Sequence, residues 1–185
     1  VIKSIKENGI VEKIEKVKPD YILVIGWSQL LPYNLLDIPQ NIHNGNTRHS
    51  KSFGCIGMHS TLLPIGRGRA PIPWTIIKGI SQTGVTCFLL EEDADAGGII
   101  LQKDFKLSNK ETATTLYEKC AKFHEILGKE LAKILSTKSL SWKEQNFIKG
   151  GIWPKRSPDD GIVNFNENIS SIERLVRALT EPYPN

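Results

Sequence analysis

The sequence predicts an α/β protein built on a doubly wound, mostly parallel sheet. Two observations carry this prediction: short apolar runs rich in β-branched residues recur along the chain, and patterns of helical periodicity lie between several of them. Continuous apolar runs are typical of strands that helices cover on both faces. Strands that alternate with helices favour a doubly wound sheet, in which ligands bind at the carboxyl ends of the strands.

The elements follow one another in a regular order. Ile10, Val11 and Ile14 lie at helical spacing, and this helix ends near Pro19, because the residue before a proline avoids helical dihedral angles. Residues 21–27 (YILVIGW) then predict a strand buried on both faces. The later elements are a short helix near 32–38, a long polar loop at 39–54, strands at 55–59, 84–90 and 98–105, and a helix at 70–79.

Two capping boxes predict the remaining helices. Ser108 and Glu111 form an S-x-x-E pattern ahead of a long amphipathic helix, and Ser170 and Glu173 form a second one. The composition changes around 136–160, where Ser, Gly, Pro and Trp residues indicate a linker. We therefore expect one domain at 1–137, followed at 138–185 by a linker and the beginning of a smaller C-terminal part.

Composition and charge describe an ordinary globular protein. The 185 residues include 24 Lys and Arg against 20 Asp and Glu, and the resulting charge of +4 forms no basic tract of the kind that marks nucleic-acid binders. The three cysteines form no CxxC pair, so neither a disulfide framework nor a zinc site is indicated, and a reducing cytoplasm fits best. No apolar run approaches the length of a membrane span. The chain begins at Val1 and ends without a closing element, so we expect a piece of a longer protein.

One histidine ends a predicted strand, where α/β enzymes keep their chemistry. His59 precedes the turn that contains Leu62, Leu63 and Pro64. A catalytic histidine needs a carboxylate to orient or charge it, and EEDADAGG (91–98) supplies one where another strand ends. The alternative is a structural histidine beside a solvated acidic loop, since the pattern identifies the loop but not the residue. The other histidines are expected to have no role in the site: His43, His49 and His124.

Two further segments are candidates for ligand contact. The loop GRGRAP (66–71) lacks the third glycine of a dinucleotide fingerprint, but Arg67 or Arg69 could clamp an anion at the start of the following helix. An arginine that bonds a loop carbonyl is equally compatible with this pattern. Trp27, Leu30 and Leu31 form an apolar shelf that could receive a flat heterocycle, although such residues more often belong to the core.

Several short motifs recur in a fixed order: GMHSTLLPIGRGRAP (57–71), TGVT (83–86) and DAGG (95–98). Together they resemble the signature of the formyltransferases that use 10-formyltetrahydrofolate, in which N-x-H, S-L-L-P and R-G precede T-G-V-T and D-x-G. WPKRSPDDGIVNF and LVRALTEPYP are most similar to the enzymes that formylate amino sugars on nucleotide carriers, and the transfer RNA formyltransferases are close relatives. The resemblance runs from about Val11 to Pro184 and implies a Rossmann-like catalytic domain that lacks its first βαβ units.

The resemblance also implies roles for individual residues. By position, His59 matches the catalytic histidine, Asp95 matches the aspartate that holds and charges it, and Arg69 matches an arginine that contacts the cofactor in the sugar-modifying branch. The residues that correspond to the folate pocket are Trp27, Gln29, Leu30, Leu31, Glu91, Glu92, Asp93 and Ala94. The implied reaction is attack by a neutral amine on the formyl carbon, with the charged imidazole stabilising a tetrahedral oxyanion, and it needs no metal.

The chain departs from the family pattern at Gly57. The family has an asparagine here, whose amide stabilises the oxyanion, and losing such a donor costs about 100- to 1000-fold in turnover. Asn44 or Asn46 of the long loop could substitute for it, the backbone N–H could suffice, or the protein is slow or inactive.

The resemblance therefore predicts an N-formyltransferase whose acceptor is a nucleotide-linked amino sugar, acting in the cytoplasm in the synthesis of cell-envelope polysaccharide. One alternative is formylation of methionyl-tRNA, and under this hypothesis the protein would bind a nucleic acid. Another is a folate-binding relative impaired by Gly57. No membrane partner is expected, and a homodimer is compatible with the sequence.

Overall fold

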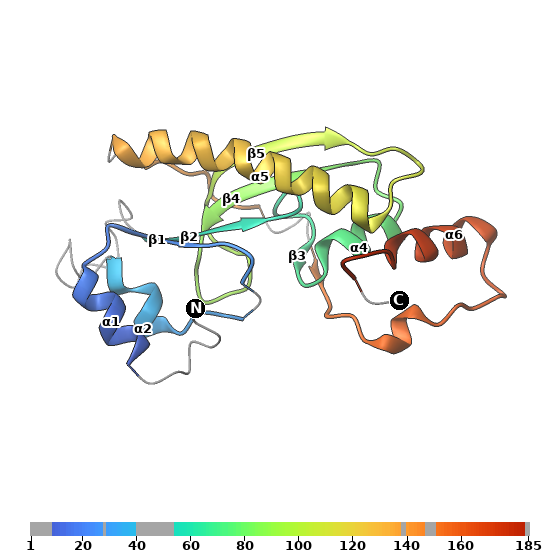
Figure 1. Cartoon of the computed structure of the whole chain (residues 1–185), viewed down its shortest axis with the longest axis horizontal. Coiled ribbons are helices and arrows are strands. Elements are labelled where there is room, and N and C mark those ends of the chain that lie inside the picture. Colours follow the sequence, from blue (N-terminus) through green and yellow to red (C-terminus); the bar gives the residue numbers. More distant parts are fainter. Residues whose placement is uncertain (1–8, 28, 40–53, 138–139, 147–150, 184–185) are drawn as a thin grey trace.

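A mixed four-stranded sheet forms the centre of the molecule. The computed structural model describes residues 9–27, 29–39, 54–137, 140–146 and 151–183. The strands, in spatial order, are β1 (Tyr21–Val24), β2 (Gly54–His59), β4 (Gln82–Leu89) and β5 (Ile99–Lys106). A second, two-stranded sheet pairs β3 (Arg67–Gly68) with β6 (Ile152–Trp153), which are far apart in the sequence. Figure 1 shows β3 beyond the end of β2, so the small sheet lies next to the carboxyl end of that strand.

The strands differ in direction from the mostly parallel sheet that the sequence predicts. β1 and β2 are parallel, and so are β3 and β6. β4 is antiparallel to both β2 and β5. The connection between β4 and β5 is too short for a helical crossover, which a parallel pair requires, so these strands form an antiparallel pair instead. The α/β class and the alternation of strands with covering helices are as predicted.

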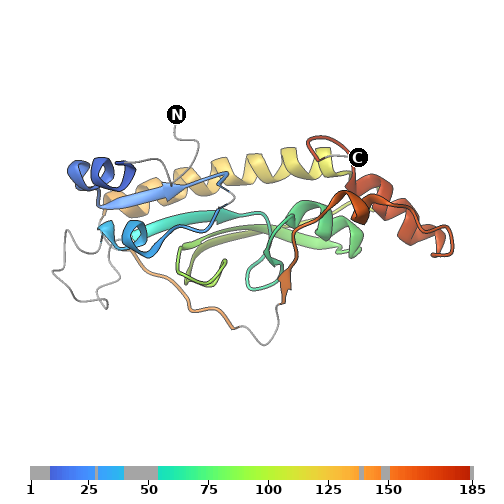
Figure 2. The same ribbon diagram turned by 90° about the horizontal axis from the view of Figure 1, so that it is seen from below.

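The helices gather at the two ends of the sheet and over one of its faces. At one end lie α1 (Ile10–Val17) and α2 (Tyr33–Leu36), and at the other α4 (Pro71–Ile77) packs against α6 (Ile169–Ala178). The long helix α5 (Ala113–Ser136) crosses one face of the sheet, as Figure 2 shows, and contacts β4 and β5. A 3₁₀ helix, η2 (Pro158–Gly161), precedes α6. None of the described helices is both long and apolar enough to cross a membrane.

Both predicted capping boxes are displaced by a few residues. α5 begins after Thr112, whose side chain accepts from the Thr115 N–H in a reciprocal capping box. Glu111 instead accepts from the Ser108 N–H and pairs with Lys119, so Ser108 lies outside the helix. The N-cap of α6 is Asn168, which accepts from the Ser171 N–H, rather than Ser170. Asn and Thr cap helices as well as Ser does, so sequence spacing alone could not choose between neighbouring candidates.

The first strand is less buried than predicted. Leu23 on β1 is 52% exposed, and Ile25 just after it is 59% exposed. The physical reason is position: β1 lies at the edge of the sheet, with β2 as its strand partner among the described residues. A strand buried on both faces needs cover on both sides, and the described residues do not supply it at Leu23 and Ile25.

The core lies between the sheet, α4 and α5, and extends to the C-terminal segment. Ala178 on α6 is fully buried in the same cluster as Val85 on β4 and Ala113 on α5. Thr114 donates its backbone N–H to the Thr180 hydroxyl, which ties the start of α5 to the end of α6. Contacts therefore cross the predicted boundary between 1–137 and 138–185, and the division into two domains stays a prediction.

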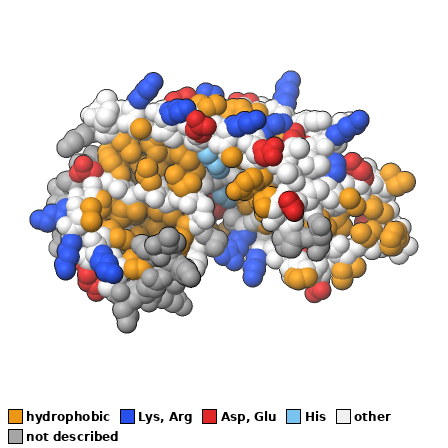
Figure 3. All heavy atoms as spheres, viewed as in Figure 1, with side chains coloured by type: hydrophobic (Ala, Val, Ile, Leu, Met, Phe, Trp, Pro, Cys, Tyr) orange, Lys and Arg blue, Asp and Glu red, His pale blue; other side chains and the backbone are white. Residues whose placement is uncertain are grey.

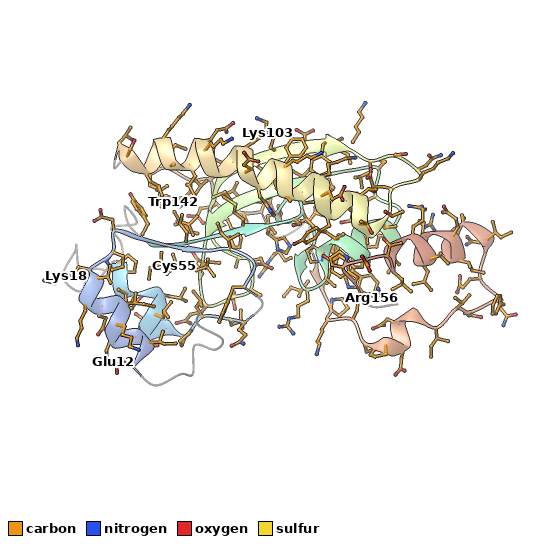
Figure 4. The ribbon with its side chains drawn as sticks, in the orientation of Figure 1. Glu12, Lys18, Cys55, Lys103, Trp142 and Arg156 are labelled. Atoms are coloured by element: carbon orange, nitrogen blue, oxygen red, sulfur yellow. The ribbon has the colours of Figure 1, made fainter. Side chains whose placement is uncertain are left out.

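The cysteines are buried structural residues, as their apolar surroundings suggest. Cys55 lies on β2, between the sheet and α2 (Figure 4), where its thiol donates weakly to the carbonyls of Leu35 and Leu36. Burial raises the pKa of the Cys55, Cys87 and Cys120 thiols to about 12. Thiols of this kind are almost entirely protonated at neutral pH, and they are poor nucleophiles and metal ligands.

Candidate active site

A cleft of about 640 Å³ opens at the carboxyl ends of β1 and β2. His59 is the last residue of β2, and its side chain lines this cleft while remaining only 8% exposed. Figure 3 shows histidine atoms in the middle of one face, with hydrophobic side chains gathered on both sides of them. Because β1 and β2 are parallel, their carboxyl ends meet at the same edge of the sheet, where the sequence predicts the site.

Both nitrogens of the His59 ring face protein groups. Nε2 lies 2.7 Å from the Gly66 carbonyl oxygen. A carbonyl can only accept, so Nε2 carries the proton in this hydrogen bond. Nδ1 lies 3.8 Å from Oδ2 of Asp95, an ion-pair distance once the ring is charged. A ring with its proton on Nε2 therefore presents its Nδ1 lone pair on the side of the carboxylate.

Asp95 is held rigidly in the connection between β4 and β5. Its φ of 51° lies in the left-handed region, which aspartate tolerates better than most residues. The Oδ2 atom that faces His59 also accepts the Gly68 backbone N–H at 2.7 Å. Gly68 itself has a φ of 100°, and a Cβ there would lie 2.4 Å from the Trp153 carbonyl oxygen, so this position requires glycine. The small β3–β6 sheet thus fixes the donor that orients the carboxylate.

Two side chains clamp the same connection: Arg67, a candidate from the sequence, and Gln145, which the sequence does not mark. Arg67 is 9% exposed and donates from Nε and a terminal nitrogen to the Ala94 carbonyl, at 2.9 and 2.8 Å. Gln145 donates to the carbonyls of Asp95 and Gly97, at 2.9 and 2.7 Å. The structure therefore supports the carbonyl-bonding reading of Arg67. Gln145 gives no signal in the sequence, because it lies far along the chain from the carbonyls that it bonds.

Most residues that match the folate pocket line the cleft. Trp27 lines it with its indole Nε1–H buried and without an acceptor among the described residues. Arg69 also lines the cleft and is exposed. The other predicted cofactor residues on its walls are Gln29, Leu30, Leu31, Glu91, Asp93 and Ala94. Glu92 is exposed and is not among the residues that line the cleft, so its assignment to the folate pocket stays a prediction.

Gly57 lies in the wall of the cleft, two residues before His59, and a side chain there would crowd its neighbours. A Cβ built on Gly57 would lie 2.8 Å from Cδ2 of Leu90 and 3.2 Å from Cε1 of Phe88. The side chain of Leu90 would therefore have to shift before any larger residue could occupy this position. The two asparagines considered as substitutes, Asn44 and Asn46, lie outside the described residues, as do His43 and His49.

His124, for which no role was predicted, lies close to the site. Burial lowers the pKa of His124 below its ordinary value, and the charge of the nearby His59 lowers it further. Its Nε2 is buried and has no partner among the described residues. Sequence reasoning missed this proximity to His59 because His124 interrupts the apolar face of an ordinary amphipathic helix. Among the same residues, no group of three or more His, Cys, Asp or Glu side chains is arranged to hold a metal ion.

Comparison with known proteins gives one sequence family and one fold. Residues 2–131 match the model of the family described as Formyl transferase. The methionyl-tRNA formyltransferase of Thermodesulfovibrio yellowstonii is 32% identical over 186 residues, which cover 98% of this chain and 54% of that protein. The chain thus spans about half the length of this curated relative.

Two solved structures share the fold. A sugar N-formyltransferase from a Shewanella species is 22% identical, with a TM-score of 0.76 over 96% of this chain and 66% of its own. The N-formyltransferase from Helicobacter canadensis, solved with folinic acid and dTDP-3-aminofucose, is 24% identical, with a TM-score of 0.62 over 68% of this chain and 48% of its own. The predicted Rossmann-like α/β fold is thereby confirmed.

Proposed function

Because this chain belongs to the formyl transferase family, we propose that its cleft transfers the formyl group of 10-formyltetrahydrofolate to the amine of an acceptor. The observation that carries this proposal is the pairing of His59 and Asp95 at the cleft wall, with Nδ1 and Oδ2 3.8 Å apart. A titratable ring beside a fixed carboxylate, at the carboxyl end of a strand, is suited to proton transfer. The cofactor supplies the formyl carbon, and the residues of this chain handle the protons and the charge.

The hydrogen bonding of the His59 ring supports one of its nitrogens as the proton carrier. Nε2 of His59 keeps its proton in the hydrogen bond to Gly66, so Nδ1 is the nitrogen that exchanges one. As the acceptor amine bonds to the formyl carbon, it loses one proton, and the nitrogen that leaves the carbon gains one. His59 Nδ1 takes up the first proton and returns it to the leaving nitrogen. Asp95 stabilises the imidazolium between these two events and holds the ring in place.

The cleft fits a folate on one wall. Leu30 and Leu31 offer apolar surface to a flat ring, and the indole Nε1–H of Trp27, which has no acceptor among the described residues, offers a donor to a ring nitrogen or carbonyl. Burying a donor without a partner costs about 1–3 kcal/mol, so a ligand that accepts from Trp27 gains that amount relative to the empty cleft. These features support a pterin on this wall, with the formyl group directed toward His59.

The other end of the cleft is aromatic and cationic, and it supports a nucleotide-linked amino sugar as acceptor. Arg69, Trp153, Pro154 and Lys155 line this end. Next to it, Lys78 Nζ lies 5.5 Å from the ring centroid of Trp74 and 5.7 Å from that of Trp153. Positive charge beside aromatic rings favours a phosphorylated ligand with a base. Methionyl-tRNA is the second candidate, because the curated relative that matches 98% of this chain carries that name.

A transfer assay distinguishes these acceptors. The protein is mixed with 10-formyltetrahydrofolate and, separately, with nucleotide-linked amino sugars or initiator methionyl-tRNA, and the formylated product is detected by mass. We expect a formylated amino sugar, and His59→Ala should abolish the product while leaving folate binding intact. A product from methionyl-tRNA alone would establish the second candidate. Folate binding without any product would indicate a relative impaired at Gly57.

A further inference from the structure

The segment that follows α5 packs against the turn that carries Asp95. Backbone hydrogen bonds of 2.8 Å run in both directions between Ile99 and Lys143, so this segment pairs with the beginning of β5. Trp142 lies over Gly98, where a Cβ would clash with the indole ring. Figure 2 shows the chain leading back from the end of α5 in this region. A segment whose composition predicts a linker thus lies against the candidate site.

Gln145 is the residue of this segment that reaches into the turn. Its side chain is 9% exposed, and Nε2 donates to the Asp95 carbonyl at 2.9 Å and to the Gly97 carbonyl at 2.7 Å. Carbonyl oxygens can only accept, so the amide nitrogen, which carries two protons, is the atom that faces them. Oε1 is buried without a partner among the described residues. The hydrogen bonds described for this side chain therefore all go to the turn.

The turn is closed only weakly by its own backbone. The Ala96 N–H donates to the Asp93 carbonyl at 3.3 Å, which is longer than the usual N–O distance of about 2.9–3.0 Å. Asp95 has a φ of 51°, in the left-handed region that residues with a side chain seldom adopt. A bend of this kind depends on donors from outside the turn, and Gln145 supplies two of them.

The position of the Asp95 backbone decides where its carboxylate points. The Asp95 carbonyl accepts from Gln145, and Oδ2 accepts the Gly68 N–H at 2.7 Å and lies 3.8 Å from Nδ1 of His59. Because the carbonyl and the carboxylate belong to one residue, a rotation of this backbone would move Oδ2 away from both the N–H and the ring. Gln145 therefore acts on the direction of the carboxylate without contacting His59.

We propose that Gln145 is a positioning residue for Asp95: its amide holds the turn in the conformation that directs the carboxylate toward His59. The kinetic consequence rests on the proposed formyl transfer, whereas the contact itself does not. A misplacement of about 1 Å near the reacting groups can cost about 100-fold in rate. Gln145 is not among the residues that line the cleft, so it exerts this control from behind the wall.

The first experiment measures amide hydrogen exchange by NMR of the ¹⁵N-labelled protein and needs no substrate. Gln145→Met keeps the length of the side chain and removes its donors. The Gly68 N–H, whose acceptor is the Asp95 carboxylate, should then exchange about 10-fold faster or more. The Arg69 N–H, which donates to the Trp153 carbonyl, should exchange as in the wild type. Equal acceleration at both amides, or no acceleration at Gly68, would overturn the proposal.

The second experiment is a double-mutant cycle in the transfer assay. We expect Gln145→Met to lose about 10- to 100-fold in kcat, with the KM for the folate within about twofold of the wild-type value. In a protein that already carries Asp95→Asn, the same change should cost less than about twofold, because the carboxylate that Gln145 positions is absent. An equal loss in both backgrounds would mean that Gln145 acts independently of the carboxylate, and the proposal would be wrong.

Lys143→Met is the matched control for both experiments. Lys143 belongs to the same segment, its side chain is exposed, and it contacts Ile99 through its backbone, so this variant should keep the wild-type kcat and the wild-type exchange at Gly68. A Lys143→Met variant with the same losses as Gln145→Met would assign them to the segment as a whole and contradict the proposal.

Two further measurements keep the outcomes distinct. Circular dichroism and thermal unfolding establish that each variant folds. If Gln145→Met does not fold, Gln145→Asn takes its place, because its amide is one methylene shorter and falls short of the two carbonyls. If the wild-type protein transfers no formyl group, the proposed function fails, and the exchange of the Gly68 N–H still decides the contact.

Discussion

At the scale of single residues, the packing of the cleft wall depends on a glycine at position 57. Leu90 and Phe88 fill the space beside Gly57, and the nearest atom is the mobile end of the Leu90 side chain. A side chain added at Gly57 must therefore displace these neighbours before it can reach any substrate. Restoring the family asparagine is then a problem of packing as well as of chemistry.

Gly57→Asn alone should lower both stability and turnover. Overpacking of this kind costs typically about 1–3 kcal/mol, and Leu90→Ala in the same protein should relieve part of that cost. Urea unfolding and kcat, measured for both single variants and the double variant, give the coupling between the two positions. Strictly additive losses would mean that the two side chains do not compete for space. A faster Gly57→Asn variant of unchanged stability would mean that glycine is a defect here.

The carboxylate of Asp95 is a second residue whose contribution can be isolated. Asp95→Asn keeps an oxygen that can accept from the Gly68 N–H but removes the charge beside His59 Nδ1. We expect formyl transfer to fall at least about 100-fold with little change in thermal stability. Glu92→Gln is the matched control, because it removes one charge of the same loop outside the cleft wall. Similar activity in both variants would remove Asp95 from the proposed mechanism.

At the scale of elements, the connection between β4 and β5 depends on side chains from elsewhere in the chain. Arg67→Met should leave the Ala94 carbonyl without the two hydrogen bonds that Arg67 donates. An unsatisfied buried carbonyl costs about 1–3 kcal/mol, and the loosened connection should also reduce formyl transfer. Chemical unfolding measures the first effect and the transfer assay measures the second. A variant as stable and as active as the wild type would show that the Gln145 contacts alone are sufficient.

The elements themselves were largely predictable, and their pairing was not. The periodicity of residues 10–17 and the apolar runs of β2, β4 and β5 predicted helix and strands correctly. The exposure of Leu23 was missed, because a sequence does not show which strand lies at the edge of a sheet. The β3–β6 pair was missed for a related reason, since two-residue strands leave no periodic pattern.

The candidate site was predicted in part, and by different kinds of signal. His59, Asp95 and Trp27 were found through short motifs and their position at strand ends, and all three line the cleft. Their catalytic and binding roles stay proposals. His124 was missed because it lies on an ordinary amphipathic helix, and Gln145 was missed because it bonds backbone carbonyls, which almost any sequence supplies. A hydrogen bond to a backbone carbonyl does not require any particular type of residue as its acceptor, so the sequence gives no sign of it.

At the scale of the whole molecule, stability should decrease on acidification in two steps. His124 has a lowered pKa in the folded protein, so the unfolded chain binds its proton first, and stability falls as the pH drops below 6.5, the ordinary value. For Glu111, burial raises the pKa, but hydrogen bonds from Lys119, Thr115 and the Ser108 backbone outweigh burial and lower it below the ordinary 4.5. Its contribution is complete above that value and is lost as the pH falls through the lowered pKa.

Unfolding free energies measured from pH 7 to pH 3 test both steps. His124→Gln should remove the loss that begins near pH 6.5, and Glu111→Gln should remove the loss that begins near pH 4.5. Glu118→Gln is the control, because Glu118 is an exposed carboxylate on the same helix. A single acid transition that neither variant alters would assign the pH dependence to other groups.

The pairing of β3 with β6 also bears on the order in which the protein is made. The Arg69 N–H donates to the Trp153 carbonyl, and the Trp74 indole donates to the Pro154 carbonyl, so the loop after His59 is completed by residues synthesised much later. While residue 150 is still inside the ribosome, Gly68 has no strand partner, and the donor that orients Asp95 is not yet fixed. A nascent chain can thus form much of its four-stranded sheet and α5 before β6 is made, and Asp95 gains the donor that orients it toward His59 only after Trp153 has emerged.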